Sequence, residues 1–309
     1  MNSDNITSVP YFVLASLEVR ADLQMIFFFS FLLVYIITIL ANMSIMIIVI
    51  SDLTLHTPMY FFLWNLAFLD ICYSSAVVPK MLTDLMFQKK IISFYGCMLQ
   101  VHFFHFLGST EAILFSAMSY DRYMAIAFPL RYSILMSSTI CLCLALCSWI
   151  LGFCHALLHT IMTFRLPFCG PNIVKHFYCD FKPVLNLACT DVSVNLKLLP
   201  RVTGTLTITT LMLTILFYIL IIKFLIKIKT SQGRKRALST CSGHFTVVTL
   251  QYGTAIFIYG LPSRKDSFGQ DRAAAIMFTV ITPALNPILY TLRNKDMKKA
   301  MKKLFKRSN

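Results

Sequence analysis

Long apolar runs separated by short polar segments dominate this chain. The first, Met25–Ile50, contains 26 residues and no charge. As a helix it would be about 39 Å long, which is enough to cross a hydrocarbon core about 30 Å thick. Six similar runs follow, at Met59–Pro79, Cys97–Ser119, Ile140–Thr163, Val202–Ile222, Ala237–Leu261 and Ala273–Leu292. The pattern predicts an all-α membrane protein, a bundle of seven transmembrane helices.

The C-terminal segment has a different pattern. On a helical projection its apolar residues gather on one side and its lysines largely on the other, which indicates an amphipathic helix lying at the membrane surface. The apolar side contains Met297, Ala300, Met301, Leu304 and Phe305, and the basic side Lys298, Lys299, Lys302, Lys303 and Lys306. We therefore divide the chain into an N-terminal segment 1–24, a seven-helix domain 25–292 and an amphipathic tail 293–309.

Composition and charge agree with a membrane protein and set its expected orientation. Hydrophobic residues make up 57% of the chain and charged residues 13%, and the mean hydropathy is +0.71. The segments after the first, third and fifth runs, together with the tail, contain 16 of the 28 Lys and Arg residues. Basic residues favour the cytoplasmic side, so the N-terminus is expected outside. The basic clusters adjoin the spans, which favours contact with anionic lipid over nucleic-acid binding.

Two kinds of covalent modification, glycosylation and disulfide formation, are expected on the outer side. Asn5 begins an Asn-Ile-Thr acceptor sequence for glycosylation. Four cysteines, Cys97, Cys169, Cys179 and Cys189, fall on the same oxidising side, where disulfides form. Four cysteines allow three pairings, and the residues alone do not choose among them.

One face of the third run contains most of the chemistry-bearing residues inside the membrane. Residues spaced by four and three positions share a helix face, and here they are Phe104, Gly108, Glu111, Phe115, Met118 and Arg122. Asp70, on the second run, lies at a similar depth to Glu111. Two close carboxyls in a low dielectric share a proton or hold a cation such as Na⁺, and the alternative is a purely structural hydrogen-bond network.

Two function classes, enzymes and transporters, lack support in the sequence. No His-Glu-x-x-His or Gly-x-Ser-x-Gly motif is present, so we expect no enzyme. A transporter or channel would explain the intramembrane carboxyls, but the chain shows no internal repeat of the kind common in transporters. The adjacent Asp121 and Arg122, taken alone, favour simple snorkelling at the membrane edge.

Four longer stretches resemble a known family. These are LHTPMYFFLWNLAFLD at 55–70, MSYDRYMAIA at 118–127, RALSTCSGHF at 236–245 and PALNPILYTLRN at 283–294. Their order and spacing resemble the motif set of olfactory receptors, a branch of the rhodopsin-like (class A) G-protein-coupled receptors. The stretch before Asp121 and the loop sequence HFYCDFKPVLNLACTD resemble the tetrapod-type, class II, members. The resemblance covers nearly the whole chain.

The resemblance implies a two-state switch at the inner end of the bundle. Asp121 would hold Arg122 in the resting state, and Arg122 would contact a G protein once the third and sixth spans separate. The further switch residues implied in this way are Tyr123, Tyr218, His244, Asn286, Pro287 and Tyr290. Pro287 removes a helix hydrogen bond and so gives a kink a physical cause.

The resemblance also implies the disulfide pairing. Cys97–Cys179 would tie the third span to the long loop, and Cys169–Cys189 would close that loop on itself. The sequence from His176 to Asp180 resembles a motif proposed to bind copper, but a disulfide-bonded Cys179 has no thiolate to offer a metal.

The expected ligand site lies where the outer halves of the third, fifth, sixth and seventh spans converge. Tyr252 is suited to its floor. The candidate wall residues are Phe104, His105, Gly108, Ser109, Ala112, Val202, Thr203, Leu206, Ile256, Tyr259 and Thr279. His105 and Ser109, one turn apart, would either orient a ligand or hydrogen-bond within the bundle. No carboxylate lies at this level of the third run to pair with an amine.

Together these features predict an odorant receptor. It would bind a small, mainly uncharged volatile molecule, activate a stimulatory, olfactory-type G protein and raise cyclic AMP in the plasma membrane of olfactory cilia. No cofactor is expected apart from the possible Na⁺ at Asp70 and Glu111. The alternative is a seven-span receptor for a small metabolite that acts outside the olfactory epithelium.

Overall fold

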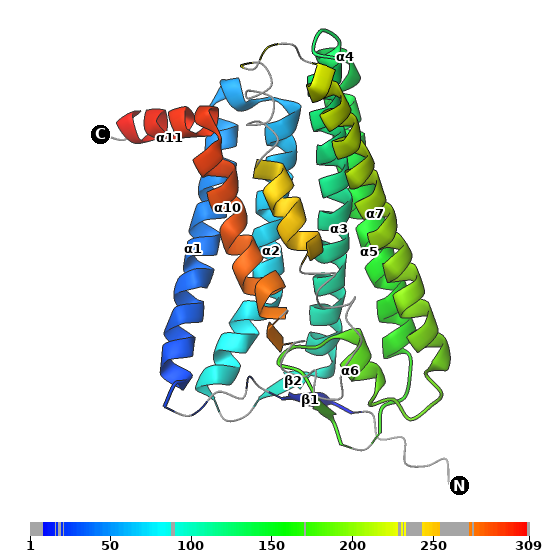
Figure 1. Cartoon of the computed structure of the whole chain (residues 1–309). Coiled ribbons are helices and arrows are strands. Elements are labelled where there is room, and N and C mark those ends of the chain that lie inside the picture. The colour runs from blue at the N-terminus through cyan, green and yellow to red at the C-terminus, as the bar shows by residue number, and fades with distance from the viewer. Residues whose placement is uncertain are drawn as a thin grey trace.

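The computed structural model describes residues 9–15, 17, 20, 22–87, 90–169, 171–227, 230, 232, 243–253, 272–273 and 275–307. Long helices lie side by side as a bundle (Figure 1). They are α1 (Gln24–Ser51), α2 (Pro58–Met86), α3 (Phe94–Ala127), α5 (Ser138–Phe164), α7 (Ser193–Lys227), residues 243–253, and the π-helical η2 (Met277–Ile281), which continues into α10 (Thr282–Arg293).

The helices agree with the predicted spans and extend beyond them. Each of the first five predicted spans lies inside one helix. The α2 helix runs through Pro79 to Met86, and α3 continues past Arg122 to Ala127. Of the predicted sixth span, Ala237–Leu261, residues 243–253 are described and are helical. The prediction of an all-α membrane bundle is therefore confirmed.

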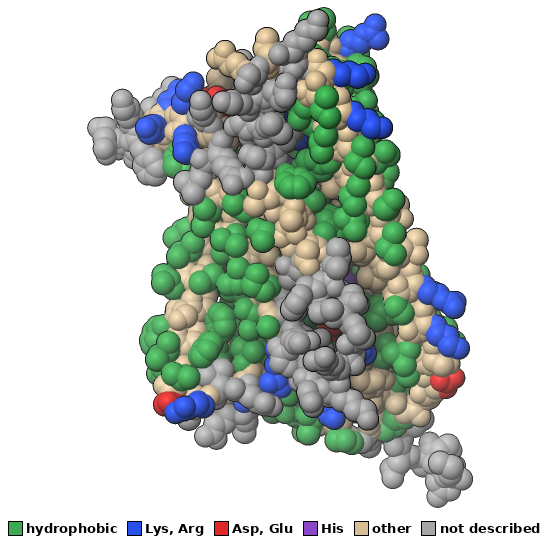
Figure 2. All heavy atoms as spheres, viewed as in Figure 1, with side chains coloured by type: hydrophobic (Ala, Val, Ile, Leu, Met, Phe, Trp, Pro, Cys, Tyr) green, Lys and Arg blue, Asp and Glu red, His purple; other side chains and the backbone are tan. Residues whose placement is uncertain are grey.

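Apolar surface surrounds the bundle at mid-height. By length and composition, four helices among the described residues are able to cross a membrane, namely α1, α2, α5 and α7. Their outward side chains are apolar, as at Phe29, Ile150 and Met212, which are 59–61% exposed. Figure 2 shows hydrophobic side chains over the middle of the visible face, with Lys and Arg near its two ends. Exposed apolar surface of this extent matches a lipid environment.

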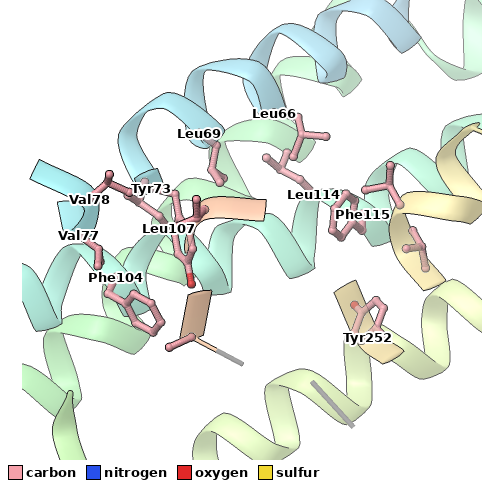
Figure 3. Close-up of a cluster of buried hydrophobic side chains, with 14 of the residues drawn as sticks. Leu66, Leu69, Tyr73, Val77, Val78, Phe104, Leu107, Leu114, Phe115 and Tyr252 are labelled. Atoms are coloured by element: carbon pink, nitrogen blue, oxygen red, sulfur yellow. The ribbon is translucent and has the colours of Figure 1, made fainter. Parts of the chain in front are cut away.

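The α3 helix lies in the interior of the bundle and packs against α2, α5 and α7. A cluster of buried apolar side chains, among them Leu66, Leu69, Leu107 and Leu114, fills the space between α2 and α3. Tyr252 faces this cluster from the sixth helix (Figure 3). The long helices α2, α5 and α7 therefore all contact α3. Polar groups on α3 can reach partners on several of these helices.

Gly152 allows the close approach of α5 to α3. A Cβ atom at this position would lie 2.9 Å from the Thr110 backbone nitrogen and 3.0 Å from the Phe106 carbonyl oxygen, and would also meet the Thr110 hydroxyl. These neighbours include α3 backbone, which does not yield easily. A side chain at position 152 would therefore push the two helices apart.

A small sheet closes the end of the bundle that carries the N-terminus. The strand β1 (Tyr11–Leu14) lies between β2 (Ile91–Ser93), which is antiparallel to it, and β3 (Ile173–Val174), which is parallel. Phe12 is fully buried and packs edge-on against Phe168, with ring centroids 5.6 Å apart. The short helix α6 (Phe181–Leu185) completes this end, which we call the sheet end. The sequence pattern did not predict the sheet.

Two disulfides fix the long loop at the sheet end. Cys97 at the start of α3 is bonded to Cys179, with Cα atoms 5.5 Å apart, and Cys169 is bonded to Cys189, with Cα atoms 5.6 Å apart. Of the three pairings that the residues alone allow, this is the one implied by the family resemblance. The loop is consequently held against the first turn of α3.

The opposite end carries the C-terminal helix α11 (Lys295–Arg307), and we call it the tail end. The α11 helix projects sideways from α10 (Figure 1). The short helices η1 (Leu53–Leu55) and α4 (Tyr132–Leu135) lie at the same end. The amphipathic helix predicted for the tail is therefore present.

Three contacts fix the position of α11. Asn294 Oδ1 accepts hydrogen bonds from the Met297 backbone N–H at 3.2 Å and the Tyr60 hydroxyl at 3.0 Å. The Met297 side chain is fully buried against α1 and α2. Lys303 Nζ lies 3.2 Å from the Asp52 carboxylate. Hydrogen bonds from Thr54, followed by that from Lys303, lower the pKa of Asp52 below its ordinary value of 3.8.

The close α3–α5 contact gives a direct test of the packing. Gly152→Ala should lower the melting temperature of the purified receptor and reduce its delivery to the cell surface, because overpacking typically costs about 1–3 kcal/mol. Gly204→Ala on α7 is the matched control, since a Cβ there meets nothing within 4 Å and alanine favours a helix. Equal melting temperatures for the wild-type protein and Gly152→Ala would contradict the proposed α3–α5 contact.

Candidate functional site

Phe104 begins the polar and aromatic face of α3 near the sheet end. Its ring is buried between Tyr73 of α2, at a centroid distance of 5.2 Å, and Tyr178 of the long loop, at 4.9 Å. Figure 3 shows Phe104 and Tyr73 in the buried cluster. Gly108, one turn further along, is partly exposed, and a Cβ there would meet Tyr73 at 3.6 Å. Phe104 thus joins the long loop to α2 and α3.

His105 pairs with a carboxylate of the long loop. His105 Nε2 lies 2.8 Å from Asp180 Oδ1, and the backbone N–H of Phe181 donates to the same oxygen at 2.8 Å. Burial raises the pKa of Asp180, but the hydrogen bond from His105, charge interactions with His105 and His176, and the Phe181 N–H outweigh it. The pKa of Asp180 therefore lies below its ordinary value of 3.8. This carboxylate is already engaged by the protein itself.

Ser109 belongs to a chain of hydrogen bonds that crosses three helices. Its Oγ is 2.9 Å from His155 Nδ1 on α5, and His155 Nε2 is 3.0 Å from the hydroxyl oxygen of Thr203 on α7. His159, one turn after His155, packs edge-on against it with ring centroids 5.0 Å apart. Both imidazoles are buried, while Ser109 and Thr203 are partly exposed. Two predicted site residues are thus joined by a histidine that the sequence analysis did not single out.

The remaining predicted site residues have different surroundings. Tyr252 donates its hydroxyl proton to the backbone oxygen of Ala112 at 3.4 Å, which links the sixth helix to α3. Val202 and Leu206 flank Thr203 on α7 and are partly exposed. Thr279 is fully buried, and its hydroxyl donates to the carbonyl of Ala275 within its own segment. Ile256 and Tyr259 lie outside the described residues, as does the glycosylation candidate Asn5.

The two intramembrane carboxyls each have an amide partner. Asn286 Nδ2 on α10 donates to both Asp70 oxygens, at 3.0 and 3.2 Å. Gln251 Nε2 on the sixth helix donates to Glu111 Oε2 at 2.7 Å. Both carboxyls are at most 3% exposed. These bonds join α2 to α10 and α3 to the sixth helix. Such a hydrogen-bond network was the structural alternative to a shared proton or a bound cation in the sequence analysis.

Among the described residues, no group of three or more His, Cys, Asp or Glu residues is arranged to hold a metal ion. Cys179, in the motif that resembles a copper site, is disulfide-bonded and offers no thiolate.

At the tail end, Arg122 is held by the residue beside it. Its Nε donates to Asp121 Oδ2 at 2.9 Å, and a guanidinium N–H also bonds this carboxylate. The Tyr132 hydroxyl on α4 donates to the other carboxylate oxygen at 2.6 Å. Burial and then the nearby Asp121 charge raise the pKa of Tyr132, so the phenol keeps its proton and remains a donor. Arg122 is 7% exposed, far less than expected for a residue whose side chain snorkels to water.

A second contact at this end joins α7 to the sixth helix. The hydroxyl of Tyr218 and Nδ1 of His244 are hydrogen-bonded at 2.6 Å. Tyr123, directly after Arg122, stacks on Phe217 of α7 with ring centroids 6.0 Å apart. Arg122 and Tyr123, Tyr218, and His244 therefore lie on α3, α7 and the sixth helix respectively, all at the tail end.

The α10 residues of the predicted switch lie between this end and the carboxyls. Pro287 is inside the helix, and Asn286 one position earlier contacts Asp70. Tyr290 packs partly buried against the hydrophobic clusters around α2. Among the described residues its hydroxyl oxygen has no hydrogen-bond partner.

The sequence analysis missed several partners of the predicted residues, namely His155, His159, Tyr132 and Gln251. For the two histidines a signal was present, because Ser148, Gly152, His155 and His159 are spaced by four, three and four positions and form one buried face of α5. Such a polar and small face on an apolar helix is a sign of packing against other helices. No comparable local signal distinguishes Tyr132 or Gln251.

The His105–Asp180 pair predicts a pH dependence of stability. Because the pKa of Asp180 is lowered by folding, its stabilising contribution is present above pH 3.8 and is lost as the pH falls through the lower folded value. Asp180→Asn should lower the melting temperature at pH 7, since a hydrogen bond to a charged group contributes about 1.5–3 kcal/mol. The difference from wild type should persist to pH 5.

The matched control for this prediction is Asp22→Asn, which removes an exposed carboxylate paired with Arg20. That change should leave the melting temperature almost unaltered, as exposed ion pairs contribute little. The same melting curve for Asp180→Asn and wild type at pH 7 would show that the pair does not stabilise the loop.

Comparisons with known proteins agree with this geometry. Residues 31–308 match the family model described as olfactory receptor. Among curated proteins, the chain is 49% identical to human olfactory receptor 12D1 over 304 residues, which is 98% of this chain and 95% of that protein. It is 47% identical to human olfactory receptor 12D2, covering 98% and 99% of the two chains, and 44% identical to mouse olfactory receptor 5G9, covering 97% and 96%.

Proposed function

This chain belongs to the olfactory receptor family of G-protein-coupled receptors, and we propose that it detects a small, mainly apolar volatile molecule and raises cyclic AMP. Family membership makes it a multi-pass membrane receptor and not an enzyme. The signal would pass through a stimulatory, olfactory-type G protein. The finer features, which are the ligand class, the coupling and the orientation in the membrane, are argued in turn below.

One observation supports the proposal above the others, which is that α3 carries bonded polar side chains along its whole length. Near the sheet end these are His105 and Ser109, at mid-depth Glu111, and at the tail end Asp121 and Arg122. Each of these side chains is bonded to another element of the bundle or, in the last case, to its neighbour. A ligand that alters contacts at one end of this helix therefore acts on the same rigid element that carries Arg122.

The state of the tail end fits an inactive receptor. Arg122 is occupied by Asp121, and Tyr132 holds the second oxygen of that carboxylate. Release of the guanidinium would expose a cationic donor at the α3 terminus, where a G protein could bind it. Binding of a ligand shifts such an equilibrium only by its different affinity for the two states.

The ligand class follows from the chemistry at the sheet end. The loop carboxylate that contacts the predicted wall, Asp180, is bonded by His105 and by the Phe181 N–H through the same oxygen. None of the predicted wall residues is itself an Asp or Glu that could pair with an ammonium group. Apolar and hydroxyl-bearing side chains predominate instead, which suits a small uncharged organic molecule.

In this proposal the receptor lies in the plasma membrane of olfactory cilia. The sheet end faces the outside of the cell and the tail end faces the cytoplasm. The support comes from the distribution of Lys and Arg along the sequence, the two disulfides at the sheet end and the lysines on α11. Anionic lipids line the cytoplasmic leaflet and attract such a basic helix.

A sodium ion or a shared proton at Asp70 and Glu111 remains part of the proposal. Two buried carboxyls with neutral amide partners still have charge to be compensated when both are ionised. Glu111→Gln should change basal cyclic AMP output or its dependence on sodium concentration. Parallel sodium titrations of the two proteins that coincide would leave only the structural network.

The signalling proposal is tested with an odorant panel of broad chemistry. Cells that express the chain with an olfactory-type stimulatory G protein should raise cyclic AMP in proportion to odorant concentration. Arg122→Ala should reach the cell surface normally but lose at least about nine-tenths of the response, because it lacks the G-protein contact.

Arg131→Ala is the matched control for Arg122→Ala, since Arg131 is an exposed arginine just beyond the end of α3. It should signal like the wild type. A full response from Arg122→Ala at equal surface display would refute the switch role, and silence of the well-displayed wild type across the panel would refute the proposed signalling.

A further inference from the structure

The side chains of Ser109, His155 and Thr203, which are hydrogen-bonded in a row, hold more exchangeable protons than their hydrogen bonds use. Two hydroxyls and a neutral imidazole hold three exchangeable protons in total, one on each oxygen and one on the ring. The two hydrogen bonds of the chain, at 2.9 and 3.0 Å, use two of them. One proton is therefore left over.

The position of the spare proton depends on the imidazole tautomer. If Nε2 carries the ring proton, Ser109 donates to His155 Nδ1, and the hydroxyl proton of Thr203 is free. If Nδ1 carries it, Thr203 donates to Nε2, and the proton of Ser109 is free. In both cases one helix presents a spare donor and the other a hydroxyl oxygen that accepts. A change of tautomer exchanges the two roles.

Neighbouring groups leave this freedom intact. Among the described residues, neither hydroxyl has a hydrogen-bond partner other than His155. His102 provides the contrast, because the Thr160 hydroxyl already donates to the Ala156 carbonyl at 2.8 Å. Thr160 must then accept from His102 Nδ1 at 3.2 Å, and the tautomer of His102 is fixed.

The surroundings indicate what would take the spare proton. His155 and His159 are 8% and 4% exposed, whereas the hydroxyl residues Ser109 and Thr203 are partly exposed. His159 Nε2 is buried with no hydrogen-bond partner among the described residues. A buried polar atom without a partner costs free energy unless something binds it, and the His159 ring packs against His155 with ring centroids 5.0 Å apart. The spare hydroxyl proton and the unpartnered ring nitrogen therefore belong to neighbouring groups.

We propose that Ser109, His155 and Thr203 form the subsite for the polar head of the ligand, and that this head is a single neutral hydroxyl or carbonyl group. The inference rests on the proposed function and adds the fourth helix, α5, to the ligand site. A hydroxyl or carbonyl head matches one spare donor and one acceptor. A carboxylate or an ammonium would lose its hydration against groups that carry no net charge.

His155 acts in this subsite as a positioning residue. It sets which hydroxyl donates, and it holds α3 and α7 at a fixed separation by bonding both. Without the ring, each hydroxyl would turn to the carbonyl four residues earlier in its own helix, as Thr207 does on α7 at 2.9 Å. The loss of one side chain on α5 would thus remove the polar preference of groups on two other helices.

The test uses the purified full-length receptor and four probes with the same eight-carbon skeleton: octane, 1-octanol, octanal and octanoate. The shift of the melting temperature against probe concentration gives an apparent Kd without any G protein. We expect 1-octanol and octanal to bind about tenfold more tightly than octane, as one well-made hydrogen bond allows. Octanoate should bind no better than octane.

Variants assign the preference to the subsite. His155→Leu should bind octane as the wild type does but lose the tenfold preference for 1-octanol and octanal. His102→Leu also removes a buried imidazole, but one that is not hydrogen-bonded to Ser109 or Thr203. This variant should keep the preference for 1-octanol and octanal. If His155→Leu does not fold, the Ser109→Ala, Thr203→Val double variant, which removes both hydroxyls at almost constant volume, replaces it and should show the same loss.

Three results would overturn the subsite: equal binding of octane and 1-octanol by the wild type, an undiminished preference in His155→Leu or in the double variant, and no stabilisation by any probe. Failure of the signalling proposal looks different. A preference that depends on His155 without any cyclic AMP response rejects the signalling alone, and a cyclic AMP response without the preference rejects the subsite alone.

Discussion

A polar side chain inside a membrane bundle has no water to bond, so it must find a partner on another helix, and this constraint organises the whole molecule. The α3 helix meets it repeatedly. His105 reaches the long loop, Ser109 reaches α5, and Glu111 reaches the sixth helix. Apolar packing holds the helices together without selecting one arrangement, whereas these bonds select particular neighbours. The identity of the fold thus depends on a few polar contacts to one central helix.

The same constraint explains how a receptor can switch. A buried hydrogen bond is made or broken as a unit, so a helix whose polar groups exchange partners has discrete positions rather than a continuous range. Asp121 has its carboxylate fully used by Arg122 and Tyr132. Tyr218 and His244 join the two helices that face this end of α3. Any state in which Arg122 turns outward requires the other two groups to find new partners as well.

Gly152 shows why geometry and polarity act together. Its missing side chain brings the α5 backbone against Thr110 and Phe106, and one turn later His155 reaches Ser109 on the same α3 face. A wider separation of the two helices would break the Ser109–His155 bond. Packing density between α3 and α5 is therefore a condition for the polar chain that continues to Thr203.

The sequence predicts what depends on local pattern, and it fails where partners come from distant segments. The helices of the bundle were predictable because apolar runs as long as Met25–Ile50 have few alternatives. The sheet at the N-terminal end was not, because β1, β2 and β3 contain only two to four residues each and the paired residues of β1 and β3 are 160 positions apart. Ser109 and Thr203 were found from their place on the helices.

The bridge between Ser109 and Thr203 was missed because no local pattern relates positions 109, 155 and 203. The disulfides are an intermediate case. Their cysteines are evident in the sequence, but their pairing came from resemblance and from the structure. In each case the missing information was a long-range contact and not a residue type.

The central claim is that Asp121 restrains Arg122 in the resting receptor. Asp121→Asn removes the charge that holds the guanidinium while nearly preserving the volume of the side chain. Basal cyclic AMP output, measured without odorant and normalised to surface display, tests the claim most directly because it needs no knowledge of the ligand. The account predicts that Asp121→Asn raises basal output several-fold above wild type. Basal output equal to or below that of the wild type, at equal surface display, would contradict it.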